Sequence, residues 1–200
     1  VAQQRERFFA GVRVARQAGL EPQLLHLANS AATFAYPDTQ FDIVRIGIAM
    51  YGVSPMEHGS AQQFGLCAVM SLHAELAHVK TIAAGESVSY GGRWTATEST
   101  RVGLVPVGYA DGIPRSAEGA WVLVKGIRCA VLGRIAMDQF VIALPAELGE
   151  IQAGEHVLIF GDSSLGAPTA DDWAAQSNSI GYEIVTRIGV RIPREYVSPA

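Results

Sequence analysis

The apolar positions in the first quarter of the chain follow the spacing of helices and of buried strands. Apolar residues recur about one turn apart over 3–18, ahead of Gly19, and predict a helix that ends at this glycine. Continuous apolar runs at 24–28 and 43–48 predict two buried strands, with a short helix over 29–34 between them. Strand, helix and strand in this order are typical of a parallel α/β layer, but one such unit leaves both edges of its sheet bare.

The hydrophobic period changes to two after a predicted linker at 54–60. Apolar and polar residues alternate over 70–76, and turn-forming glycines separate further strand candidates. A helix with an acidic cap is predicted around Trp173, a second over 182–188, and a last strand over 190–194. The pattern predicts an antiparallel barrel or sandwich. Its other expected strands cover 101–107, 121–125, 128–132, 140–144 and 156–160.

Composition excludes several classes of protein. With 49% hydrophobic and 17% charged residues the chain is globular, and a net charge of −4 without a Lys/Arg run gives no sign of nucleic-acid binding. Cys67 and Cys129 do not make a disulfide framework, which favours reduced thiols and a cytoplasmic location. No apolar run is long enough for a bilayer, and no metal motif occurs. The start, at Val1, reads as the interior of a longer gene product.

A tyrosine between a serine and two glycines is the first candidate for chemistry. Tyr90 lies in the segment 87–95, where Gly91 and Gly92 leave the phenol poorly covered and let the backbone approach a ligand closely. An exposed tyrosine is ordinary, so this segment alone does not establish a catalytic role.

Two segments in the α/β part are candidates for ligand contacts. Asn29 and Ser30 stand where a strand ends and a helix begins, so N–H groups and a hydroxyl can meet an anion there, although Ser30 can equally be an ordinary helix cap. Arg45 lies inside an apolar strand, where a buried guanidinium needs a partner, which can be an acidic side chain in a structural ion pair. Gly47 follows at the end of this strand.

Two polar segments join predicted strands in the β part. Residues 106–112 read as a strand that runs into an Asp-Gly turn, and residues 133–139 as a loop that offers Arg, Asp and Gln together. Either can be a structural turn without a function.

Five patterns occur in one order along the chain. They are H-x-A-N-S-A from His26, V-R-x-G-I-x-x-Y-G from Val44, V-S-Y-G from Val88, V-G-Y-A-D-G from Val107 and G-R-x-x-M-D-Q from Gly133. Together they resemble the fold-type III alanine racemases, enzymes that depend on pyridoxal 5′-phosphate (PLP). The segments S-I-G-Y-E and R-I-P-R near the end are similar to that family as well, so the resemblance covers nearly the whole chain.

The resemblance implies an N-terminal β/α barrel of the TIM type followed by a mainly antiparallel, all-β C-terminal domain. Residues 1–66 are then the last units of an incomplete PLP-binding barrel, and residues 67–200 are the β domain. The family's aldimine lysine lies on the first barrel strand, in a segment that this sequence lacks. The only lysines are Lys80 and Lys125, both in the β domain. We therefore expect a fragment that is inactive by itself.

The resemblance also assigns the acid–base group. Tyr90 matches the family's tyrosine, which works on one face of the cofactor while the lysine works on the other. A phenol has a pKa of about 10, so it needs a nearby positive charge or hydrogen-bond donors to act as a base near neutrality. Tyr90 is expected to reach the barrel of a neighbouring subunit, which implies a homodimer with shared active sites.

For the cofactor, the resemblance implies that Arg45 faces the pyridine nitrogen, with His26 beside it. Guanidinium keeps its proton, since its pKa exceeds about 12, and can donate a hydrogen bond without protonating the ring. Ser30, with Asn29 adjacent, matches a phosphate ligand. The backbone at Gly47 and Ile48 completes the phosphate site.

The resemblance places the substrate in the β part of the sequence. Met137 matches the position whose backbone meets the substrate carboxylate, and three residues, Tyr109, Arg134 and Asp138, are expected to line the access channel. Two positions depart from some relatives: Ala136 stands for a cysteine, and Val190 for a tyrosine near the phosphate.

The implied reaction is the interconversion of L- and D-alanine, which supplies D-alanine for peptidoglycan. A serine or broad-spectrum racemase differs only in pocket volume, and the sequence does not separate a biosynthetic from a catabolic enzyme. The alternative from another class is a non-catalytic product, either truncated or a detached β domain that acts as an interaction module.

Overall fold

The computed structural model describes residues 1–56 and 59–197, and the chain divides into two compact units, Val1–Cys67 and Ala68–Ala200. Two residues of the predicted linker, Glu57 and His58, lie outside the described residues. Among the described helices, none combines the length and the apolar character needed to cross a bilayer.

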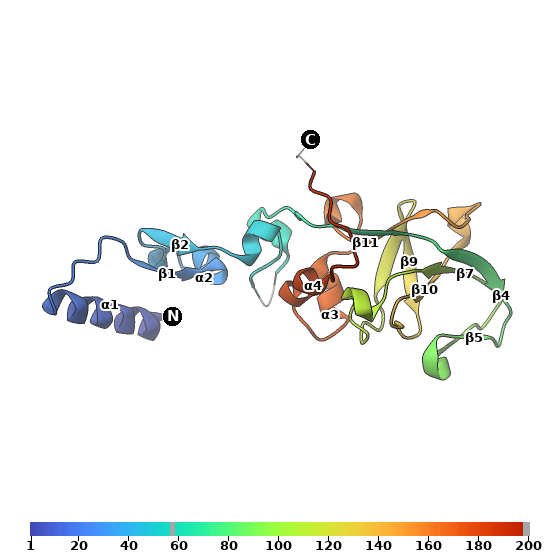
Figure 1. Cartoon of the computed structure of the whole chain (residues 1–200), viewed down its shortest axis with the longest axis horizontal. Coiled ribbons are helices and arrows are strands. Elements are labelled where there is room, and N and C mark those ends of the chain that lie inside the picture. Colours follow the sequence, from blue (N-terminus) through green and yellow to red (C-terminus); the bar gives the residue numbers. More distant parts are fainter. Residues whose placement is uncertain (57–58, 198–200) are drawn as a thin grey trace. The chain divides into compact units, whose positions relative to one another are not determined.

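The first unit contains the predicted strand–helix–strand motif (Figure 1). Helix α1 (Ala2–Gln17) precedes strand β1 (His26–Asn29), helix α2 (Ser30–Ala35) and strand β2 (Ile43–Arg45). Strands β1 and β2 pair in parallel, as the sequence predicts. Gly19 has a φ of +81° just after α1, the left-handed conformation that commonly ends a helix.

The prediction that these two strands are buried is wrong for this unit. Ala28 is fully buried, but Leu24 is 60% exposed and Ile43 is 42% exposed. The sheet has only two strands, so most of its apolar surface has nothing to pack against. Helix α1 likewise buries none of its residues, although Phe8 stacks on Phe41 with ring centroids 5.2 Å apart.

The second unit is built on one antiparallel sheet of seven strands, in the order β3-β11-β8-β9-β10-β7-β4. A separate two-stranded hairpin carries the Tyr90 segment. The sheet strands are β3 (Leu72–Glu75), β4 (His78–Ile82), β7 (Thr100–Val105), β8 (Trp121–Val124), β9 (Ile127–Leu132), β10 (Phe140–Ala143) and β11 (His156–Phe160). The hairpin strands are β5 (Ser87–Val88) and β6 (Trp94–Thr95).

The two edge strands of the sheet are consecutive in the chain, which requires the sheet to curl. Leu76 continues β3 along β11, because its N–H donates to the Glu155 carbonyl at 2.9 Å and its carbonyl accepts from Gly154. The next residue, Ala77, donates at 2.8 Å to the Leu104 carbonyl of β7, the strand beside the opposite edge strand β4. The chain therefore passes from one edge of the sheet to the other within two residues, so the antiparallel β part expected from the sequence forms as a single curled sheet.

The core of the second unit lies inside this curled sheet and under two short helices. Helix α3 (Ala170–Ala175) begins with the predicted acidic cap, since Thr169 and Asp172 hydrogen-bond each other reciprocally. Trp173 is almost fully buried, donates its Nε1–H to the Ile159 carbonyl at 2.7 Å and packs edge-on against Phe140. Helix α4 (Gly181–Arg187) packs on α3 and confirms the second predicted helix.

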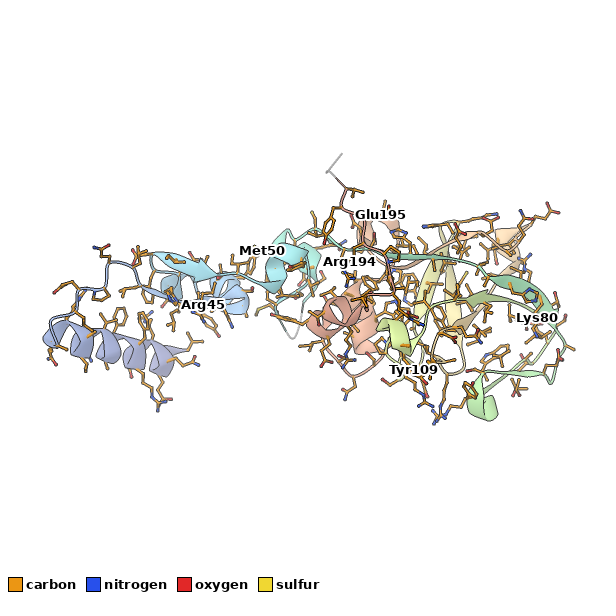
Figure 2. All side chains as sticks on the ribbon, viewed as in Figure 1. Arg45, Met50, Lys80, Tyr109, Arg194 and Glu195 are labelled. Atoms are coloured by element: carbon orange, nitrogen blue, oxygen red, sulfur yellow. The ribbon has the colours of Figure 1, made fainter. Side chains whose placement is uncertain are left out.

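The predicted last strand, residues 190–194, does not form. Residues 190–192 make a turn, in which the Ile192 N–H donates to the Gly189 carbonyl, and Pro193 has no N–H for a sheet. The guanidinium of Arg194 donates to the Ile188 carbonyl at 2.6 Å and folds this segment back on the end of α4 (Figure 2). The five strands expected between 101 and 160 all form, whereas β4, β5 and β6 were not predicted.

Candidate active site

The first cluster of predicted site residues lies at the carboxyl ends of β1 and β2. Arg45, labelled in Figure 2, donates through Nη1 to the Leu27 carbonyl at 2.9 Å and lies 3.2 Å from His26 Nδ1. Arg45 is exposed in this unit, so the expectation of a buried guanidinium is wrong. Within the described residues no carboxylate forms an ion pair with it. Its Nε and Nη2 donors are therefore available.

Ser30 follows β1 directly and is hydrogen-bonded to the backbone just after β2. It is 5% exposed, and its Oγ accepts a hydrogen bond from the Gly47 N–H at 3.0 Å. The cap of α2 is Asn29, whose side chain accepts from the Ala32 N–H, so the alternative that Ser30 is the helix cap is wrong. Because Ser30 Oγ accepts this bond, its own hydrogen remains free for an acceptor outside the described residues. Ile48 follows as a buried residue.

The second cluster surrounds the hairpin of the second unit. Tyr90 is 71% exposed at the tip between β5 and β6, in a turn with Gly91 and Gly92 in left-handed conformation. Ser89 also has a positive φ, +64°, which is strained for a serine, and its Oγ donates to the Arg134 carbonyl. This hydrogen bond fixes the turn on the loop between β9 and β10.

The same loop also holds the turn that follows β7. The N–H groups of Tyr109 and Ala110 donate to the carbonyls of Ala136 and Met137, at 3.1 and 2.8 Å. The loop thus brings together all five site residues predicted for the β part of the sequence. Besides Tyr90, four of them have exposed or half-buried side chains on this loop and turn: Tyr109, Arg134, Met137 and Asp138.

Backbone packing between this turn and this loop leaves no room for a side chain at Gly108. A Cβ there would lie 2.4 Å from the Ala136 carbonyl oxygen and 2.5 Å from that of Met137. Real Cβ atoms do not approach backbone oxygens this closely, so Gly108 is required for the loop to reach the turn. The turn that begins at Gly108 is therefore held by close backbone packing against the loop.

A cavity beside Tyr109 contains charged residues that the sequence analysis did not single out. It has a volume of about 310 Å³ and is lined by Tyr109, Ile113, Arg115 and Arg187, among others. Arg187 also pairs with Glu183 at 3.0 Å on the surface of α4. Neither arginine carries a sequence signal, because Arg187 resembles an ordinary i,i+4 surface pair and Arg115 lies in a turn.

Among the described residues, the local contacts of the two lysines involve no predicted site residue of the second unit. Lys80 is in the middle of edge strand β4, and Lys125 forms an ion pair with Glu155 at 2.6 Å in the turn after β8. Neither lies in a motif of the site, in agreement with the sequence.

Comparison with known sequences gives a family for both parts of the chain. The sequence model described as "Alanine racemase, C-terminal domain" matches residues 69–196, and that of the N-terminal domain matches residues 1–55. This chain belongs to the alanine racemase family. The match to the C-terminal domain alone covers more than half of the sequence.

Individual alanine racemases match over almost the whole chain. That of Streptomyces coelicolor is 52% identical over 200 residues, and that of Frankia casuarinae 48% identical over 193 residues. The crystal structure from Streptomyces coelicolor A3(2) superimposes with a TM-score of 0.94 at 51% identity, covering 99% of this chain and 52% of that one. The α/β part followed by an antiparallel β domain is therefore the fold of alanine racemases. The chain spans about half the length of the alanine racemases that it matches.

Proposed function

We propose that this chain forms part of the active site of a PLP-dependent alanine racemase, which interconverts L- and D-alanine. The observation that carries the proposal is the Arg45 guanidinium: it is exposed, has no carboxylate partner in the described residues, and is oriented by His26 and the Leu27 carbonyl. A cation held in this way without an internal partner is suited to a ligand. The family match supports alanine as the substrate.

The residues of the first unit fit PLP. The phosphate needs hydrogen-bond donors, and Ser30 has a hydroxyl hydrogen to donate, with the backbone of Gly47 and Ile48 adjacent. The pyridine nitrogen needs one donor, and Arg45 retains Nε and Nη2 for it. When bound, PLP withdraws electrons from the α-carbon of the amino acid and makes its hydrogen acidic.

Arg45 determines how strongly electrons are withdrawn. A guanidinium can donate a hydrogen bond to the ring nitrogen without transferring its proton. The two contacts from the β1 side fix the guanidinium plane and keep His26 next to it. A moderate withdrawal of electrons favours return of the proton to the α-carbon over side reactions such as transamination.

Tyr90 moves the α-proton at its phenol oxygen. Its exposure leaves the oxygen accessible, and the Ser89–Arg134 hydrogen bond holds the turn that presents it. The Arg134 guanidinium lies beside this turn, since a Cβ on Gly91 would be 3.7 Å from Nη1. We further propose that the Met137 backbone meets the substrate carboxylate, and that Tyr109, Arg134 and Asp138 line the access channel.

The rest of the proposal concerns the whole protein. We infer a cytoplasmic homodimer in which Tyr90 serves the active site of the neighbouring subunit, and a role in D-alanine supply for peptidoglycan. The exposed position of Tyr90, with no partner side chain in its own unit among the described residues, supports this sharing. The alternative is a β domain that only mediates interactions, which the buried core of the second unit favours.

A chimera distinguishes the two. This chain replaces the matched half of the Streptomyces coelicolor alanine racemase, to which it is 52% identical. We expect the purified chimera, supplied with PLP, to form D-alanine from L-alanine, while the 200-residue chain alone does not. A chimera that folds and binds PLP without racemase activity would support the interaction module.

A further inference from the structure

Two histidines from neighbouring strands face each other at the edge of the second unit's sheet. His73 lies on β3 and His156 on β11, with Nδ1 of the first 2.8 Å from Nε2 of the second. Their rings are 4.8 Å apart between centroids and tilted by 40°. Both side chains are exposed, so the pair is accessible from solvent.

The strand register adds two oxygen-bearing side chains to the same face. His156 is directly opposite Glu75 in the antiparallel pair, and cross-strand partners point to one side of a sheet. Ser71, His73 and Glu75 alternate along the same edge, which places all three on that side. The Lys125 ammonium does not pair with Glu75, because it forms an ion pair with Glu155 and donates to the Glu150 carbonyl.

Ser71 can fix the tautomer of His73. Its Oγ lies 2.6 Å from His73 Nε2, so when this nitrogen carries the hydrogen and donates it to the serine, the lone pair of Nδ1 points at His156. Metal-binding histidines typically donate their second ring N–H to an oxygen in this way.

The spacing of the two nitrogens fits a shared ion. Two imidazole nitrogens that bind one ion at about 2.0–2.1 Å are roughly 3.0–3.4 Å apart, depending on the angle between them. The observed 2.8 Å contact is a hydrogen bond between the two rings, so binding requires both exposed rings to rotate until their lone pairs converge on one ion, with the nitrogens a few tenths of an ångström further apart.

We propose that His73 and His156 form a surface site for a divalent transition-metal ion of the zinc, nickel or copper type. No group of three metal-binding side chains is preformed among the described residues, so Glu75 has to change rotamer to supply a third ligand, and water completes the coordination. Imidazole favours these ions over magnesium and calcium, which prefer oxygen ligands. This site uses no residue of the proposed racemase chemistry and stands independently of it.

Titration calorimetry of the full 200-residue chain tests the site, with the protein free of an affinity tag and stripped with EDTA. We expect one Ni²⁺ or Zn²⁺ per chain, at least tenfold weaker binding in His73→Asn or His156→Asn, and about tenfold weaker binding in Ser71→Ala. His78→Asn is the matched control, because His78 is also an exposed histidine of an edge strand, and it should bind metal like the parent protein.

Electron paramagnetic resonance of the Cu²⁺ form should show two nitrogen ligands in the parent protein and one in either single variant. Circular dichroism without metal checks that the variants remain folded. The proposal is overturned if His78→Asn weakens binding as much as the other two variants, or if His73→Asn and His156→Asn bind Ni²⁺ like the parent. Equal affinity for Mg²⁺ and Ni²⁺ would contradict it as well.

Discussion

Asp111 forms an ion pair with Arg191 through two hydrogen bonds, although the two residues are eighty positions apart in the sequence. One carboxylate oxygen of Asp111 accepts from Arg191 Nε at 3.0 Å and from Nη2 at 2.7 Å, while the other accepts from the Gly108 N–H at 2.9 Å. The pair ties the turn that carries Tyr109 to the segment after α4. It is also asymmetric, because the Asp111 side chain is 4% exposed and that of Arg191 is 58% exposed.

This difference in burial predicts that removing Arg191 and removing Asp111 lower the free energy of unfolding by different amounts. Arg191→Ala leaves a buried carboxylate without its counter-charge and should lower the free energy of unfolding by about 2–4 kcal/mol, near the lower end for buried pairs. Asp111→Asn leaves an arginine that water can solvate and should cost about 1–2 kcal/mol. Urea unfolding of both variants and of the double variant measures this. The asymmetry argument is wrong if Asp111→Asn is the more costly change.

Gly108 should tolerate no side chain. Gly108→Ala forces a methyl group onto the backbone of Ala136 and Met137 and should cost about 1–3 kcal/mol. Gly189→Ala is the matched control, since its Cβ would lie 3.6 Å from the Ala110 carbonyl oxygen, an ordinary contact, and should change stability by less than about 0.5 kcal/mol. Thermal unfolding compares the two. Similar melting temperatures would show that the loop can move away from the turn.

The two cysteines should differ in reactivity. Burial raises the pKa of the Cys129 thiol to about 11, against a smaller opposing effect of Arg101, whereas Cys67 is exposed. Only thiolates react with disulfide reagents, so at pH 8 the folded chain should titrate one thiol quickly and the second only after unfolding. Cys67→Ser should remove the fast reaction and Cys129→Ala should leave it. Two equally fast thiols in the folded protein would contradict the burial of Cys129.

Stability should rise with pH in the range where His73 titrates. Because the pKa of His73 in the folded protein lies below its ordinary value of 6.5, the unfolded chain binds more protons between those two values. This contribution to stability therefore increases as pH rises through that window and is complete above about 6.5. His156→Asn removes the smaller cause, so NMR titration should show a His73 pKa that rises but stays below 6.5. A pKa unchanged by this substitution would mean that His156 exerts no effect on the ring.

Much of the β domain could be predicted because its strands alternate. Strand β10, for example, buries every second residue of Phe140–Ala143. Strand β4 was not predicted because it is an edge strand in which buried and exposed residues do not alternate regularly. Ile82 is buried, but His78, Lys80 and Thr81 are exposed. The false strand at 190–194 has alternating residues, but tertiary hydrogen bonds of Arg194 decide its conformation.

Some features of the candidate site could likewise be predicted from the sequence, whereas others require the structure. The resemblance to the family placed His26 beside Arg45, and the two residues stand on adjacent strands of one local motif. The hydrogen bond from Ser89 to Arg134 and the ion pair of Asp111 with Arg191 join residues 45 and 80 positions apart, and no local pattern indicates them. Sequence therefore identifies the chemical groups, and the long-range contacts that position them require the structure.

The most direct test of the account is solvent exchange of the α-hydrogen in the chimera with Tyr90→Phe. Losing one oxygen keeps the ring, so folding and PLP binding should survive. In D₂O, deuterium incorporation from L-alanine should fall by about 10²–10⁴-fold, the usual value of one positioned base, while incorporation from D-alanine persists. Near-parental exchange from both enantiomers would contradict the account and leave Tyr90 as an exposed turn residue.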